Sequence, residues 1–341
     1  MTSDTVVRSA RGTAATGRTL LRVTAAALLL AASLVQAEWL HDEQPIMGTR
    51  VTVTLWHDDR ARGEQAIAAV LAEMRRIDAA WNPDNPAGEL AALNAGAARQ
   101  PVRVSAEMLQ VLARARDFGE LTGGAFDVTF ASVGHYYDYR AGAAPSDAQR
   151  REALPAIDYR SVILDPVAGT VRYTHPGTRI DLGGIAKGHA IDCAVRVLRE
   201  HGVAHASVSA GGDSYLLGDR RGRPWLVGIK NPRGEQAALV LPLSDTALST
   251  SGDYERYFID PASGERIHHI LNPRTGRSAE GIASVSVLGP RGIDTDALST
   301  SVFVLGVERG LALLNRLPGV DGVIIDRSGK VFYSEGLAPP E

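Results

Sequence analysis

The sequence predicts an α+β fold in which mixed sheets and packed helices form one compact unit. Segments with helical periodicity and alternating β-branched segments follow one another without strict strand–helix–strand alternation. The composition is that of an ordinary globular protein, with 45% hydrophobic and 22% charged residues in 341. That length permits one large domain or two closely associated ones. We find no internal repeat and no low-complexity tract.

The N-terminus is typical of an export signal. A positively charged region is followed by an apolar run over 23–35, and Val35-Gln36-Ala37 resembles a cleavage site. Residues 1–37 are therefore predicted to be a signal peptide, with an uncleaved N-terminal membrane anchor as the alternative. No cysteine lies near this site, so the chain is not expected to be a lipoprotein. The predicted mature domain covers 38–341.

Charge and cysteine content narrow the function classes. The net charge is −3 and no long basic run lies outside the N-terminus, so nucleic-acid binding has no electrostatic basis. Cys193 is the only cysteine and cannot form an internal disulfide. We expect it to be a buried helix residue and not a nucleophile.

The first half of the mature chain alternates between strand and helix patterns. A β-branched alternating run predicts a strand at 50–56, and apolar residues at helical spacing predict a helix over 63–80. A loop with two prolines is expected at 81–88. Ser105 is predicted to cap a second helix that ends at Gly123-Gly124. A hairpin is expected from 161–164 and 170–174.

The second half begins with a glycine-rich entry into a helix over 185–201, which Gly202 should end. The last helices are expected around Asp296 and over 308–317. Further strands and hairpins are predicted at 206–208, 215–217, 225–230, 247–248, 254–259 with 266–270, 284–288, and 322–325 with 330–333.

Two segments near the C-terminus carry the strongest chemical signal. His268-His269-Ile270-Leu271-Asn272-Pro273-Arg274-Thr275-Gly276 forms a polar turn after a hairpin. If the histidines lie on a strand, they face opposite ways, so at most one points into a given site. Asp296 and Thr300 lie four residues apart on one helix face and present hard oxygens, which suit Mg²⁺ or Ca²⁺. A divalent ion beside an imidazole and an arginine turn indicates phosphate chemistry.

Four further polar turns are ambiguous when taken singly. Gly-Gly-Ala-Phe-Asp at 123–127 is either a ligand contact or a helix end. In Ala-Gly-Gly-Asp at 210–213, the aspartate is best explained as a residue that orders the loop. Asp-Leu-Gly-Gly-Ile-Ala-Lys-Gly at 181–188 offers an anion-friendly helix entry but is not a Walker A loop. Thr-Ser-Gly-Asp-Tyr at 250–254 belongs to a hydroxyl-rich strand exit that lacks the elbow of a serine nucleophile.

Taken together and in this order, these segments make the chain resemble the ApbE family of flavin transferases. The resemblance runs from about Met47 to the C-terminus. It implies an FAD:protein FMN transferase, which splits FAD and attaches FMN through a phosphoester to a Thr or Ser of a target protein. It also implies, as acceptor, a flavin-carrying subunit of a quinone reductase or related electron-transfer complex. A periplasmic location, with membrane association through the N-terminus, would fit that acceptor.

The resemblance also assigns residues. His269 matches the family's proton acceptor, and its ordinary pKa near 6.5 suits a general base. Asp296, Thr300 and the Gly184 carbonyl would hold the metal, Mg²⁺ or Ca²⁺. The implied FAD site is formed by Met47, Trp81, Ala125, Phe126, Asp127, Asp181, Lys187 and Leu271. Trp81 departs from the family pattern, which often has a tyrosine there.

Two other functions stay open at this point. An FAD pyrophosphatase would use the same site with water as acceptor. A periplasmic FAD-binding protein would store or deliver FAD without cleaving it. The presence of both Asp296 and His269 argues against a simple binder, which needs no general base.

Overall fold

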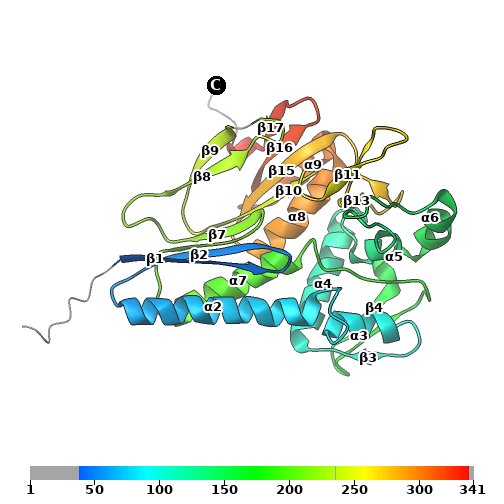
Figure 1. The fold of residues 1–341 in the computed structure, drawn as a ribbon, viewed down its shortest axis with the longest axis horizontal. Coiled ribbons are helices and arrows are strands. Elements are labelled where there is room, and N and C mark those ends of the chain that lie inside the picture. The colour runs from blue at the N-terminus through cyan, green and yellow to red at the C-terminus, as the bar shows by residue number, and fades with distance from the viewer. Residues whose placement is uncertain (1–37, 235, 338–341) are drawn as a thin grey trace, which may run out of the picture.

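The structure is a computed structural model that describes residues 38–234 and 236–337 (Figure 1). The predicted α+β class is confirmed. The centre is an eight-stranded sheet with the order β1-β2-β6-β7-β10-β15-β16-β17, and each neighbouring pair is antiparallel. Its strands are β1 Glu38–Ile46, β2 Thr49–His57, β6 Ala206–Ala210, β7 Asp213–Leu217, β10 Thr246–Gly252, β15 Ile282–Gly289, β16 Asp321–Asp326 and β17 Val331–Tyr333.

Helices pack side by side on one face of this sheet. They are α2 Arg60–Trp81, α7 Ala186–Glu200, α8 Gly292–Leu305 and α9 Val307–Leu314. In turn, α2 contacts β1 and β2, α7 contacts β6 and β7, and α8 contacts β10 and β15. Helix α8 is buried almost all round, because the sheet, α7, α9 and α4 all pack against it.

A separate two-stranded hairpin lies next to the main sheet (Figure 1) and shares a small apolar cluster with it. It consists of β8 Trp225–Lys230 and β9 Ala237–Leu243. Ile229 of β8 packs with Leu248 of β10 and Leu288 of β15 in a cluster separate from the main core. The sheet is therefore supported by helices and, in part, by this hairpin.

The remaining elements lie at one end of the helical layer (Figure 1). They are α3 Glu89–Gly96, α4 Ala106–Leu121, α5 Ala131–Gly134, α6 Asp147–Ala153 and the small sheet of β3 Val102–Arg103, β5 Thr170–Tyr173 and β4 Val162–Asp165. Two short hairpins, β11 Tyr257–Ile259 with β12 Arg266–His268 and β13 Leu271–Asn272 with β14 Arg277–Ser278, complete this end. Short 3₁₀ turns lie at Val128–Phe130, Leu154–Ala156, Tyr159–Ser161 and Glu335–Leu337.

The predicted helix boundaries follow from local chemistry. The Ser105 side chain accepts a hydrogen bond from the Met108 backbone N–H at 3.1 Å and so caps α4 as predicted. Gly202 follows α7 with a φ of +74°, the left-handed conformation that glycine adopts without a Cβ penalty. By contrast, α2 continues to Trp81, so the following loop begins one residue later than expected.

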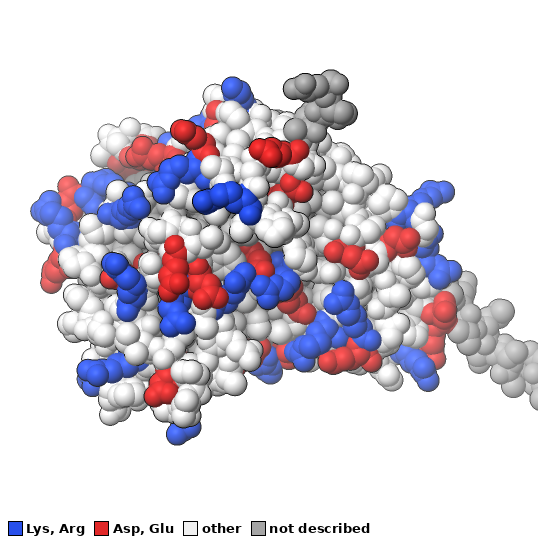
Figure 2. Space-filling view, turned by 180° about the vertical axis from the view of Figure 1, so that it is seen from behind, with Lys and Arg blue, Asp and Glu red and all other residues white. Residues whose placement is uncertain are grey.

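The chain's ends and surface bear on other expectations. The predicted signal segment 1–37 lies outside the described residues. Among the residues that the structure describes, no helix has the length and apolar character needed to cross a membrane. Figure 2 shows Lys and Arg side chains interspersed with Asp and Glu on the face seen there.

Candidate active site

A cavity of about 1170 Å³ opens where the glycine-rich turns meet the helical layer. This volume exceeds what a drug-sized ligand usually needs, so it admits an extended molecule. Every predicted site residue except Trp81 lines it: Met47, Ala125, Phe126, Asp127, Asp181, Gly184, Lys187, His269, Leu271, Asp296 and Thr300. The fold thus brings together segments that are far apart in the sequence.

One wall of the cavity carries a charged cluster. Lys187, in the first turn of α7, places Nζ 2.6 Å from Oδ2 of Asp213 and 3.4 Å from Oδ1 of Asp296. The Gly188 backbone N–H donates to Oδ2 of Asp296 at 2.9 Å. The predicted loop-ordering task of Asp213 thus takes the form of an ion pair with Lys187.

Helices α7 and α8 cross closely beside this cluster. A Cβ on Gly188 would overlap the backbone carbonyl of Gly292. The Asp192 carboxylate also accepts hydrogen bonds from the N–H groups of Gly292 and Ile293, at 2.6 and 3.0 Å. Gly188, the glycine of the 183–188 segment that lies inside α7, is therefore explained by packing. This packing fixes Asp296 relative to Lys187.

Burial sets the ionisation of the cluster. Burial, assisted by the charge of Asp213, raises the pKa of Asp296 above its ordinary value. Burial alone would lower the pKa of Lys187, but Asp213 and Asp296 outweigh it and raise that pKa. Lys187 is therefore a cation at neutral pH, and additional positive charge at Asp296 would favour its carboxylate form.

The three predicted metal ligands lie on this same wall. Asp296 is 2% exposed, and Thr300 follows one turn later on α8. Gly184 packs against Thr300, because a Cβ built on Gly184 would lie 3.4 Å from the Thr300 hydroxyl oxygen. A carboxylate, a hydroxyl and a main-chain carbonyl form an all-oxygen donor set, which fits a hard divalent cation.

The second wall carries His269, in the connection between β12 and β13. Its backbone N–H donates to the Arg256 carbonyl at 3.1 Å, and its Nδ1 lies 3.3 Å from the same oxygen. A carbonyl can only accept, so Nδ1 carries the hydrogen and Nε2 keeps its lone pair. The chain therefore fixes the tautomer that can accept a proton at Nε2.

The environment of His269 changes one expectation. Burial, followed by the charges of Arg256 and His268, lowers the pKa of His269 to about 3. The pKa at this site therefore lies below the ordinary value of a free histidine, because the sequence does not reveal how deeply a side chain is enclosed. At neutral pH the imidazole is in its neutral, proton-accepting form.

His268 faces away from the cavity, as strand alternation predicts. It is fully buried, and its Nε2 lies 2.9 Å from the Ala279 carbonyl oxygen. Its ring meets Phe303 of α8 edge-on, at 5.5 Å between centroids. His268 thus anchors the hairpin to the core while His269 lines the site.

Two predicted FAD-site carboxylates already accept hydrogen bonds from the protein. Asp127 accepts from the N–H and hydroxyl of Thr129, at 2.8 and 2.5 Å, and from the Tyr159 N–H at 2.9 Å. Burial raises the pKa of Asp127 to about 6. Asp181 accepts from the Gly183 N–H at 2.6 Å. Both side chains line the cavity and also shape the turns that form it.

Trp81 is the one predicted site residue that the structure places elsewhere. It is 4% exposed, its Nε1–H donates to Glu89 at 3.2 Å, and its ring lies 5.1 Å from that of His189. The expectation that its ring lines the FAD site is not met, because α2 continues through Trp81 and turns the side chain into the core.

Other cavity residues were not predicted from the sequence. Arg256 supplies a cation close to Gly48, and Asn94 fixes the wall through two hydrogen bonds of 2.8 Å with the Ile180 backbone. Tyr137 and Tyr139 stack at the same cavity, with ring centroids 5.7 Å apart. None of these belongs to a glycine-rich motif, so only the fold reveals them.

Comparison with known proteins agrees with this arrangement. The model of the ApbE family matches residues 47–324. The chain is 34% identical over 312 residues to an FAD:protein FMN transferase of Treponema pallidum, covering 86% of each chain. Its structure is similar to the crystal structure of the ApbE protein from Thermotoga maritima, with a TM-score of 0.81, 32% identity and coverage of 88% of this chain and 98% of that one.

A second solved structure, the flavin transferase ApbE from Vibrio cholerae, has a TM-score of 0.78 and 25% identity, with the same coverage of 88% and 98%. Family match, sequence identity and fold all extend over most of the chain. The chain therefore belongs to the ApbE family.

Proposed function

We propose that this protein is an FAD:protein FMN transferase that moves FMN from FAD to a hydroxyl of an acceptor flavoprotein. One observation carries the proposal: the Lys187–Asp296 cluster and the proton-accepting His269 line the same cavity. Cleavage of a pyrophosphate needs charge neutralisation and in-line positioning. The names of the relatives in the ApbE family support the same activity.

The reaction follows from these residues. The acceptor hydroxyl oxygen bonds to the phosphorus of the FMN moiety, the phosphoanhydride bond breaks, and AMP leaves with the bonding electron pair. His269 takes the hydroxyl proton at Nε2, while the Arg256 carbonyl holds the ring through Nδ1. Lys187 and Arg256 supply positive charge around the cavity where the phosphates would lie.

We further propose that the activity depends on a divalent cation, with Mg²⁺ favoured and Ca²⁺ as the alternative. Asp296, Thr300 and the Gly184 carbonyl would hold the ion, which would supply positive charge against the pyrophosphate. The all-oxygen donor set and the buried position of Asp296 support this assignment.

The proposed acceptor is a flavin-carrying subunit of a quinone reductase or related electron-transfer complex. The proposed location is the periplasm, with residues 1–37 as an export signal or inner-membrane anchor. Support comes from the charged, then apolar, N-terminal sequence.

The test is a product balance. The protein is incubated with FAD, Mg²⁺ and an acceptor domain, and AMP is quantified beside protein-bound flavin fluorescence in a denaturing gel. We expect one AMP for each FMN attached, and no attached flavin when the acceptor Thr is replaced by Ala. AMP and free FMN formed at an unchanged rate without acceptor would instead indicate the pyrophosphatase. FAD that binds but stays intact would indicate the binding protein.

A further inference from the structure

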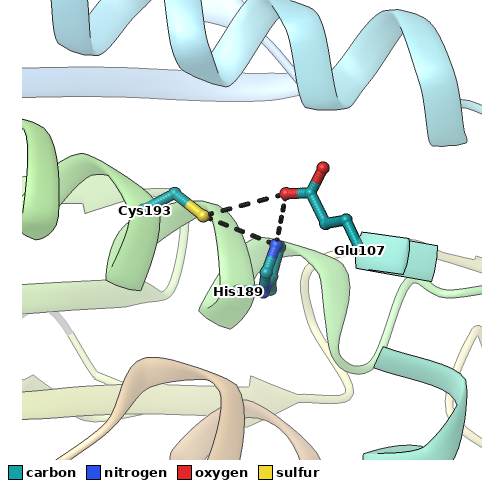
Figure 3. A group of neighbouring side chains, drawn as sticks. All are labelled: Glu107, His189 and Cys193. Atoms are coloured by element: carbon teal, nitrogen blue, oxygen red, sulfur yellow. Dashed lines mark hydrogen bonds and ion pairs between the residues drawn. The ribbon is translucent and has the colours of Figure 1, made fainter. Parts of the chain in front are cut away.

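Three side chains of different chemistry converge outside the cavity. Glu107 lies in the first turn of α4, while His189 and Cys193 lie four residues apart on one face of α7 (Figure 3). None of the three lines the cavity described above. Figure 3 shows the thiol, the imidazole and the carboxylate pointing toward a common point between the two helices.

The distances within this cluster suit a shared metal ion. Glu107 Oε1 lies 2.8 Å from His189 Nε2, and Cys193 Sγ lies 3.4 Å from Nε2 and 3.9 Å from Oε1. Zinc–ligand bonds of about 2.0–2.3 Å in tetrahedral geometry place neighbouring ligand atoms roughly 3.3–3.7 Å apart. The three observed separations bracket that range, so small side-chain adjustments would accommodate an ion.

The donor set points to zinc and away from the catalytic cation. A thiolate and an imidazole are soft or borderline ligands that select Zn²⁺, whereas Mg²⁺ prefers oxygen alone. We propose that Glu107, His189 and Cys193 form a Zn²⁺ site that links α4 to α7. Three protein ligands leave one position of a tetrahedral ion for water.

The surroundings preorganise the ligands. Arg76 of α2 donates to both oxygens of Glu107, at 2.8 and 2.9 Å, and Glu73 in turn holds Arg76 at 2.8 Å. The Trp81 ring covers His189. Groups that fix the orientation of metal ligands are a regular part of metal sites.

Glu107 is ionised in the form that binds a metal, whereas the Cys193 thiol must first lose its proton. Burial tends to raise the pKa of Glu107, but hydrogen bonds from Arg76 and His189 outweigh it, so Glu107 is a carboxylate at neutral pH. Burial raises the pKa of Cys193 to about 11, so without metal the sulfur carries its proton. Zinc binding replaces that proton, which is released to solvent as the Zn–S bond forms. It also takes the Nε2 lone pair of His189, so the hydrogen that Nε2 donates to Glu107 moves to Nδ1 in the bound state.

The site lies close to the catalytic wall. His189 directly follows Gly188, whose N–H holds Asp296, and Lys187 precedes them in the same turn of α7. An ion that links α4 to α7 would therefore stabilise the helix that carries the charged cluster.

Co²⁺ is the most direct probe, because a thiolate ligand gives an intense charge-transfer absorption that oxygen ligands do not give. The chain has one cysteine, Cys193, and the proposed catalytic ligands include no sulfur, so this absorption reports the second site alone. Chelator-treated full-length protein is titrated with Co²⁺, then with Zn²⁺, in the presence of millimolar Mg²⁺. We expect the absorption to saturate at one equivalent and to vanish when Zn²⁺ displaces Co²⁺.

Cys193→Ser should abolish the absorption and weaken Zn²⁺ binding by about 100-fold or more. His201→Gln is the matched control, because His201 is exposed directly after α7 and its replacement should leave both unchanged. No thiolate absorption in the wild-type protein would overturn the proposal and leave a hydrogen-bonded cluster only, whether or not the variant folds. Equal Zn²⁺ affinity of wild type and Cys193→Ser would overturn it as well.

Discussion

The two walls of the cavity are built in different ways. On the α7–α8 wall, Lys187 and Asp296 belong to buried helices and are tied to Asp213 and to the Gly188 backbone. On the second wall, His269 follows β12, a strand of three residues, and is held by one carbonyl, that of Arg256. The first wall is part of the core, and the second is carried by short hairpins.

This difference separates two tasks. A preformed charged wall can neutralise phosphates without rearrangement, which is where electrostatic preorganisation has most effect. The hairpin wall needs only to present the lone pair of His269 Nε2. Because His269 lies in the connection between two short strands, this wall can adjust when the acceptor protein binds. Variants on the first wall should therefore affect FAD and metal, and variants on the second should affect proton transfer.

Among variants of the α7–α8 wall, Asp296→Asn has the largest expected effect. The amide oxygen can still accept from the Gly188 N–H, so the fold should persist, whereas Asp296→Ala would leave a buried site unfilled. Loss of the proposed metal ligand should lower flavin transfer on the order of 10³-fold, since a catalytic cation contributes several kcal/mol. Transfer rates are measured against Mg²⁺ concentration, with circular dichroism as the fold control. Wild-type rates in this variant would contradict the metal assignment.

Lys187→Met should act mainly on FAD. The Lys187 ammonium is the cation of the charged cluster and lines the cavity, so its loss should raise the FAD concentration at half-maximal rate about 10- to 100-fold. The thermal midpoint should also fall, because Asp213 is 2% exposed and loses its partner. Lys330→Ala, at an exposed position in the last hairpin, is the control. An unchanged FAD titration would assign Lys187 a structural task only.

The pH profile tests the hairpin wall. Because the pKa of His269 is lowered to about 3, the neutral base is present above that pH and is lost only as the pH falls toward it. At saturating Mg²⁺, which under the proposed metal assignment keeps Asp296 ionised, kcat/KM should change less than about twofold from pH 7.5 to pH 5.5. A tenfold fall centred near pH 6.5 would mean that His269 titrates as an exposed histidine does.

Trp81→Phe should have the smallest effect, because Trp81 lies outside both walls. The variant loses the indole hydrogen bond to Glu89, which should cost about 1 kcal/mol of folding free energy. FAD affinity should stay within about twofold of wild type, as expected of a residue without ligand contact. Thermal unfolding and FAD fluorescence quenching measure the two quantities. A large loss of FAD affinity would mean that Trp81 contacts FAD.

Local sequence rules predicted the features that depend on local geometry. The four-residue spacing correctly predicted that Asp296 and Thr300 share one wall. Alternation correctly predicted that His268 and His269 face different ways, and Ser105 caps its helix as expected. These results depend on backbone period or on contacts between residues a few positions apart, both of which a single sequence carries.

Features set by tertiary contacts were not predicted. The edge strand β1, Glu38–Ile46, contains charged residues and a proline, so its sequence does not predict a strand. It is a strand because it pairs with β2. Arg256 and Asn94 reach the cavity from segments without a motif. The lowered pKa of His269 depends on enclosure by distant residues.

The separation of tasks is tested most directly by His269→Ala, measured for FAD affinity and for flavin transfer in the same preparation. We predict FAD affinity within about threefold of wild type and a transfer rate lower by 10²–10⁴-fold, the usual effect of losing a general base. His268→Ala, which removes a buried ring, should lower the thermal midpoint but keep transfer within about tenfold. Near-normal transfer by His269→Ala, or a dead His268→Ala that is fully folded, would contradict the account.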